Sequence, residues 1–205
     1  MDTLLAKDYI DYLDSLRPLV VKCTTVGINI RYEVINDTSF DIQDKKPTIK
    51  QPLGTGSATY NNPSNRILKI IDYEHFLNQQ PDNIIQALAL KKCDFIVYHL
   101  DGNECFILNE LSLSSSSKNK INDARQQLHN ALFNLSNTPA IKSFMDNFAK
   151  RLCIFSNKSK TIETPEGIAD AFDLIKKHLP EPVLHGFQPI EKLDFKFIET
   201  AIIDI

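Results

Sequence analysis

Two apolar, β-branched runs on either side of a short polar segment constrain the fold more than any other feature of the chain. The first run, CDFIVYHL, covers Cys93–Leu100, and the second, ECFILNELS, covers Glu104–Ser112. The residues between them, Asp101–Asn103, are of the types that form tight turns. This pattern predicts an antiparallel β-hairpin.

The length of the turn decides which side chains share a face of the hairpin. If three residues form the turn, Leu100 lies across from Glu104, and counting back along the strands places Asp94 directly across from Glu110. A two-residue turn would instead pair Asp94 with Asn109 and move Glu110 to the other face, because side chains alternate with period two. The longer turn therefore predicts two carboxylates on one face.

Two carboxylates on one face predict a cation site. Such groups repel each other and raise a pKa unless a cation lies between them, and a hard ion such as Mg²⁺ favours oxygen ligands. A bound divalent ion can support phosphoryl displacement, which is the chemistry of nucleases. We therefore expect Asp94 and Glu110 to be ligands of Mg²⁺, with Mn²⁺ as a substitute. The alternative is that each is an ordinary acid at the edge of a sheet.

Helices and strands alternate around this hairpin. The most regular helical stripe runs from Ile121 to Leu135, with apolar residues three or four positions apart. Other predicted helices are Thr3–Leu16, Asp82–Leu90, Ala140–Lys150 and Pro165–His178, and other predicted strands are Leu19–Ile28, Ile30–Ile35, Arg66–Tyr73, Leu152–Ser156 and Leu193–Ile205. This order predicts an α/β (α+β) fold with a mixed central sheet flanked by helices.

The chain length and composition predict one domain over residues 1–205. The sequence is 42% hydrophobic and 24% charged, which is typical of a globular chain with one sizeable core. Prolines and glycines scattered among polar residues predict a long polar loop over Asp37–Ser64. The four cysteines lack CxxC spacing and lie in or beside apolar runs, which favours buried free thiols.

The net charge and hydropathy of the chain bear on whether it binds nucleic acid or a membrane. The formal net charge of −3 does not favour a dedicated DNA-binding domain, which usually carries a basic excess. No run approaches the roughly 20 apolar residues that cross a bilayer, and Met1–Arg17 has acids among its apolar residues, unlike a signal peptide. We therefore expect a cytoplasmic protein without membrane association.

The central region resembles the PD-(D/E)XK nuclease-like superfamily, in which an Asp on one strand and a Glu-x-Lys on the next bind the metal and position the attacking water. CDFIVYH, with Asp94, resembles the first strand, and CFILNELS, with Glu110, resembles the second. KINDARQQLHNAL is similar to the helix that carries a Gln in many relatives, here Gln126 or Gln127. The resemblance covers residues 91–156, about a third of the chain, and implies a restriction-endonuclease-like core.

The chain departs from the family pattern at Ser112, which stands where the family has lysine. A neutral hydroxyl cannot supply the positive charge that helps to position and polarise a nucleophile. The following helix could supply it, because Lys120 and Gln127 point to the same edge of the apolar stripe, whereas Lys118 lies on the opposite edge. The alternative is a solvated lysine, because a helix N-terminus disfavours a cation at Lys120.

The sequence thus predicts a nuclease-like protein with a degenerate site that acts as a nucleic-acid-binding or protein-binding subunit. The family implies a defence or mobile-element system, and we expect a partner protein or a homo-oligomer. One alternative is an active Mg²⁺-dependent nuclease that uses Asp94, Glu110, Lys120 or Lys118, and Gln127. Another is an interaction subunit of unrelated α/β fold that docks through residues 37–64 and the apolar tail.

Overall fold

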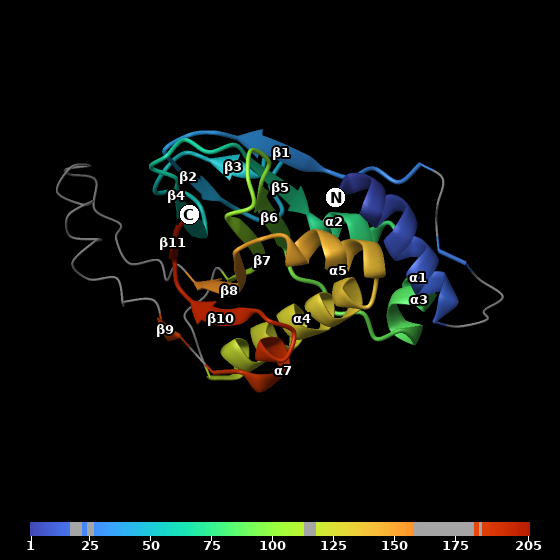
Figure 1. Cartoon of the computed structure of the whole chain (residues 1–205). Helices are drawn as coiled ribbons and strands as arrows, with labels where there is room; N and C mark the ends of the chain where they lie inside the picture. Colours follow the sequence, from blue (N-terminus) through green and yellow to red (C-terminus); the bar gives the residue numbers. More distant parts are fainter. Residues whose placement is uncertain (17–21, 24–26, 113–117, 158–182, 185) are drawn as a thin grey trace.

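The computed structural model describes residues 1–16, 22–23, 27–112, 118–157, 183–184 and 186–205 (Figure 1). These residues form an α+β fold with a seven-stranded sheet, a four-stranded sheet and a set of helices. The large sheet has the order β1 (Tyr32–Ile35), β5 (Leu68–Asp72), β6 (Phe95–His99), β7 (Cys105–Ser112), β8 (Lys150–Asn157), β10 (Lys196–Glu199) and β9 (Val183–Leu184). The small sheet has the order β11 (Ile202–Asp204), β4 (Ala58–Asn61), β2 (Ser39–Ile42) and β3 (Lys50–Gln51).

Both sheets are mixed. Strands β5, β6 and β7 are antiparallel neighbours, whereas β8 pairs in parallel with both β7 and β10. In the small sheet, β11 from the end of the chain pairs in parallel with β4. The mixed sheet flanked by helices that the sequence predicts is therefore confirmed.

Helices cover one face of the large sheet, and the small sheet covers the other (Figure 1). The helical elements are η1 (Leu4–Tyr9), α1 (Ile10–Ser15), α2 (Tyr73–Asn78), α3 (Asp82–Ala87), α4 (Lys118–Ser136), α5 (Pro139–Asp146) and α7 (Gln188–Glu191). Strand β6 is buried on both faces: Ile96 and Tyr98 pack in the helix-side core, and Phe95 and Val97 pack between the sheets. This burial explains why its sequence is continuously apolar.

The helical stripe after the hairpin forms α4 as predicted. Its apolar face packs in the core between the helices and the large sheet, through Ala124, Leu128, Ala131, Leu132 and Leu135. The predicted opening helix corresponds to η1 and α1, and the predicted strand at Leu152–Ser156 lies within β8. The predicted helix Pro165–His178 and part of the predicted strand Leu19–Ile28 lie outside the described residues.

The prediction of a long polar loop over Asp37–Ser64 is wrong. This segment contains β2, β3 and β4, and its apolar side chains Phe40, Ile42, Ala58 and Tyr60 are buried between the sheets. The strands are short, with two to four residues each, so no long alternating pattern marks them. The small sheet also includes β11, which pairs with β4 and comes from the far end of the chain.

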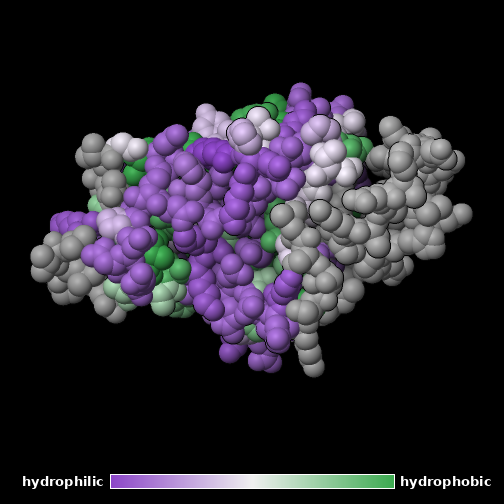
Figure 2. All heavy atoms as spheres, turned by 180° about the vertical axis from the view of Figure 1, so that it is seen from behind, coloured by the Kyte–Doolittle hydropathy of each residue, from purple (hydrophilic) through white to green (hydrophobic). Residues whose placement is uncertain are grey.

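The apolar tail forms two strands rather than one. β10 joins the large sheet, and β11 joins the small sheet, where Ile203 is buried. The two segments that could have served as docking elements, residues 37–64 and the tail, therefore build the inter-sheet core. On the face turned away from Figure 1, hydrophilic residues dominate the described part of the surface (Figure 2).

Candidate metal centre

The register of the central hairpin agrees with a three-residue turn. The strands pair as Phe95 with Asn109, Ile96 with Leu108, Val97 with Ile107, and Tyr98 with Phe106. The next pair in this register is Asp94 with Glu110, as the sequence predicts for the longer turn. Both acids line one cavity of about 580 Å³.

Asp94 is held at the start of β6 by its side chain and its backbone. Its carboxylate Oδ2 accepts a hydrogen bond from the Leu111 N–H at 2.6 Å. Its carbonyl accepts from the N–H groups of Tyr73 at 2.9 Å and Glu74 at 3.3 Å, in the first turn of α2. These contacts join β6, β7 and α2 at one corner of the sheet.

Glu110 is buried with one oxygen unsatisfied. The residue is 9% exposed, and none of the described residues offers its Oε2 a hydrogen-bond partner. Buried polar atoms are nearly always paired, because an unpaired one loses its hydration without compensation. An unpaired carboxylate oxygen on the wall of a cavity therefore points to a ligand that binds there.

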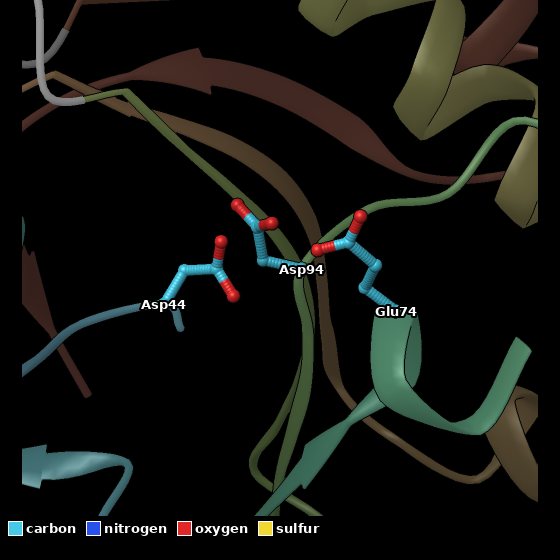
Figure 3. Close-up of side chains that lie close together, drawn as sticks. All are labelled: Asp44, Glu74 and Asp94. Carbon is cyan, nitrogen blue, oxygen red and sulfur yellow. The ribbon is translucent and has the colours of Figure 1, made fainter. Parts of the chain in front are cut away.

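Asp44 and Glu74 add two further acids that the sequence reasoning missed. One carboxylate oxygen from each of Asp44, Glu74 and Asp94 lies within 4.8 Å of the other two. Figure 3 shows Asp94 between the other two acids, whose carboxylates point toward it. Asp44 lies in the turn between β2 and β3, and Glu74 lies in the first turn of α2.

The two missed acids differ in how visible they are in the sequence. Glu74 lies two residues after the end of β5, and the last residue of that strand, Asp72, caps α2, so two acids at a strand end were a detectable signal. Asp44 lies in the segment that the sequence pattern assigns to a loop. Its approach to the hairpin depends on the pairing of the small sheet, for which the sequence offers no local signal.

Helix α4 contributes Asp123 and Gln127 to the cavity wall, and three lysines also line it: Lys45, Lys91 and Lys92. Gln127 thus lies where the family resemblance implies a Gln. Lys120 is not among the lining residues, and Ser112 lies at the end of β7, two residues beyond Glu110. The side chain of Lys118 is outside the described part of the structure.

The acids of the hairpin hold protons more tightly than ordinary carboxyls do. Burial, reinforced by the charge of Asp44, raises the pKa of Asp94 to about 8, although the hydrogen bond from Leu111 opposes this shift. Burial, reinforced by the charge of Asp94, raises the pKa of Glu110 to about 10. At neutral pH the two carboxyls of Asp94 and Glu110 therefore hold at least one proton unless a cation replaces it.

The neighbouring acids favour the charged form of Lys45. The charge of Asp44, whose carboxylate lies 3.3 Å from the Lys45 ammonium, raises the pKa of this lysine. Glu74 and Asp94 raise it further. The lysine is therefore a stable cation at the rim of an acidic cavity.

Comparisons of the chain with protein-family models, with curated proteins and with solved structures gave no match. Within the described ranges, every helix is too short or too polar to cross a lipid bilayer. The fold and the cavity are thus the observations on which a function can be proposed.

Proposed function

We propose that the cavity is a divalent-metal centre that hydrolyses phosphodiester bonds of nucleic acid. Its ligands are drawn from Asp44, Glu74, Asp94 and Glu110, which line the cavity together. The observation that carries the proposal is the cluster of Asp44, Glu74 and Asp94, which bring one carboxylate oxygen each within 4.8 Å of the other two. Glu110, with its buried and unpaired Oε2, lines the same cavity. Mg²⁺ is the expected ion, with Mn²⁺ as a substitute, because both favour oxygen ligands.

The electrostatics of the cavity support a cation. Burial raises the pKa of both Asp94 and Glu110, and the charges of neighbouring acids raise it further, because the fold holds these groups among other carboxylates in a poorly hydrated position. Replacing such an arrangement with neutral side chains would be favourable for folding, so its presence is typical of a functional site. A divalent ion would compensate the repulsion and allow both carboxylates to ionise.

The carboxylates, Lys45 and Gln127 have separate roles in this proposal. The carboxylates would hold the ion, and when bound the ion would supply activation of water and stabilisation of the negative charge of the phosphoryl group. The Lys45 ammonium attracts and orients a phosphate oxygen, the role that the family assigns to the lysine replaced by Ser112. The Gln127 side chain positions water or phosphate from the α4 side.

Strands β6 and β7 and helix α4 support the family resemblance. Asp94 and Glu110 come from neighbouring antiparallel strands, and α4 brings Gln127 to the same cavity. These are the relations that a restriction-endonuclease-like core with a PD-(D/E)XK site requires. The substitution at Ser112 then becomes a relocation of the positive charge to Lys45.

A second candidate function is nucleic-acid or protein binding without hydrolysis, as a subunit of a defence or mobile-element system. The observation that favours it is the neutral Ser112 two residues beyond Glu110. In this case the centre would hold an ion and a phosphate group, but cleavage would be absent. A cleavage assay separates the two functions.

The test is cleavage of labelled single-stranded and double-stranded DNA and RNA with Mg²⁺, Mn²⁺ or EDTA. We expect metal-dependent cleavage by the wild type and loss of at least a hundredfold in Asp94→Asn and Glu110→Gln. Asp11→Asn is the matched control, because Asp11 is an exposed acid of α1. Metal binding without cleavage of any substrate would favour the second function.

A further inference from the structure

We propose that Arg31 is a positioning residue that holds the turn carrying Asp44 and Lys45 against helix α2. This inference rests on the proposed metal centre and deepens it, because it explains how a ligand from the small sheet reaches ligands on the large sheet. The residues that carry it are Arg31, Glu33 and Asp72. None of them is among those that line the cavity.

The Arg31 guanidinium joins two segments that are far apart in the sequence. Its Nη1 lies 3.2 Å from Oδ2 of Asp72, and its Nη2 donates a hydrogen bond to the Lys46 carbonyl. The Arg31 carbonyl also accepts from the Asp72 N–H at 2.9 Å. A planar guanidinium suits this role, because its donors point in two fixed directions at once.

Asp72 ties Arg31 to the helix against which the turn is held. Its second oxygen, Oδ1, accepts from the His75 N–H at 2.8 Å and so caps α2. The same turn of α2 carries Glu74, whose N–H donates to the Asp94 carbonyl. Arg31 therefore pairs directly with the residue that caps the helix carrying Glu74.

Glu33 holds the far end of the turn. Its two carboxylate oxygens accept from the N–H groups of Ile49 at 2.7 Å and Lys50 at 2.8 Å. Arg31 and Glu33 are two residues apart, so in extended backbone they point to the same side. Together they fix the segment at Lys46 and at Ile49.

The anchored segment contains a strained residue that needs support. Lys45 has φ 58°, a left-handed conformation that non-glycine residues seldom adopt. Such a conformation persists only where neighbouring contacts enforce it. The Arg31 contact to the next residue, Lys46, is placed to do so, and it sets the direction of both Asp44 and Lys45.

The consequence is a preorganised ligand. Without the guanidinium, the turn would have to be ordered when the ion binds, and the affinity would fall by the cost of that ordering. The effect should act through Asp44. It should therefore disappear when Asp44 can no longer bind the ion.

The experiment is a double-mutant cycle on Mn²⁺ affinity, measured by calorimetry with the full chain. We expect Arg31→Met and Asp44→Asn each to weaken Mn²⁺ binding at least tenfold, and the double variant to bind no more weakly than Asp44→Asn alone. Arg66→Met is the matched control, because Arg66 pairs with Glu104 by the hairpin turn. It should leave the affinity unchanged.

Hydrogen exchange of the metal-free protein is the second measurement. Arg31→Met should raise amide exchange in residues 43–50 and leave the β6–β7 amides protected. The role of Arg31 would be overturned if amide exchange in residues 43–50 were unchanged in Arg31→Met. It would also be overturned if the double variant lost the product of the two single losses of Mn²⁺ affinity. If Arg31→Met binds Mn²⁺ normally while Asp94→Asn does not, only this inference fails; if the wild type binds no Mn²⁺, the proposed metal centre fails and this role with it.

Discussion

The carboxylate of Asp94 accepts a hydrogen bond from the backbone N–H of Leu111, with 2.6 Å between Oδ2 and N. Leu111 directly follows Glu110, so this one contact fixes the position of both acids of the hairpin. It also means that the orientation of Asp94 is set by the folded strands before any ion is present. The part of the proposed metal centre that lies on the large sheet is thus preformed.

The first prediction concerns stability and pH in the metal-free protein. Unfolded carboxyls have pKa values near 4, whereas folded Asp94 has a pKa of about 8, so the folded state binds more protons than the unfolded state between these values. The contribution of this pair to the free energy of unfolding should therefore be fully present below about pH 4 and be lost progressively as the pH rises through 8. Urea unfolding in EDTA across this range measures how steeply the free energy of unfolding falls with pH.

Two controls accompany this pH series. Glu110→Gln should flatten the slope, because a neutral amide removes the repulsion with ionised Asp94. Saturating Mn²⁺ should reverse the trend in the wild type, since metal binding displaces protons from these carboxyls and strengthens as pH rises. Stability that rises with pH in EDTA would contradict the crowding of the two carboxylates.

The second prediction concerns the relocated cation. Lys45→Met should lower cleavage at least tenfold while leaving Mn²⁺ affinity intact or stronger, because the ammonium repels the ion and attracts the phosphate. Lys120→Met is the control and should retain activity, since Lys120 does not line the cavity. Full activity of Lys45→Met would show that the Lys45 ammonium does not act on the phosphate.

The third prediction tests the position that the family reserves for lysine. Ser112→Lys introduces a charge two residues beyond Glu110, on the same side of β7. It should restore part of the cleavage that Lys45→Met loses. Cleavage assays of the double variant measure the rescue, and a double variant no more active than Lys45→Met would show that β7 cannot present the charge to the cavity.

The fourth prediction concerns the contact between the two sheets. The Tyr60 hydroxyl donates to Oδ1 of Asn109 at 3.0 Å in the inter-sheet core, where both residues are fully buried. Tyr60→Phe should lower the free energy of unfolding by about 1–2 kcal/mol, because it leaves a buried amide oxygen without its donor. Chemical denaturation measures this loss.

The matched control for this contact is Tyr32→Phe, since Tyr32 is 48% exposed on the edge strand β1. It should change stability by less than about 0.5 kcal/mol. Equal effects of the two substitutions would show that the Tyr60–Asn109 hydrogen bond does not hold the small sheet in place.

The sequence predicts the central hairpin well because its determinants are local. Turn residues, apolar runs and the spacing of Asp94 and Glu110 all lie within residues 93–112, and the observed register follows from counting. The α4 stripe is equally local, since helical periodicity needs no distant partner. Gln127 reaches the cavity for the same reason.

The rest of the centre depends on tertiary contacts. Asp44 approaches Asp94 because β2 and β4 pack on the large sheet, and β4 in turn pairs with β11 from the end of the chain. Lys45 lies in the same turn, whereas the sequence points only to the following helix, with Lys120 or Lys118, as the source of the missing charge. A local pattern cannot reveal ligands that are brought together by pairing of distant short strands.

The most direct test of the metal centre is calorimetric titration of Mg²⁺ and Mn²⁺ into the wild type and into the double variant Asp94→Asn, Glu110→Gln, with Asp11→Asn as the control acid. We expect saturable binding to the wild type and to Asp11→Asn, and affinity at least tenfold weaker in the double variant. Equal binding of the ions by wild type and double variant, or binding by neither, would contradict the proposed metal centre.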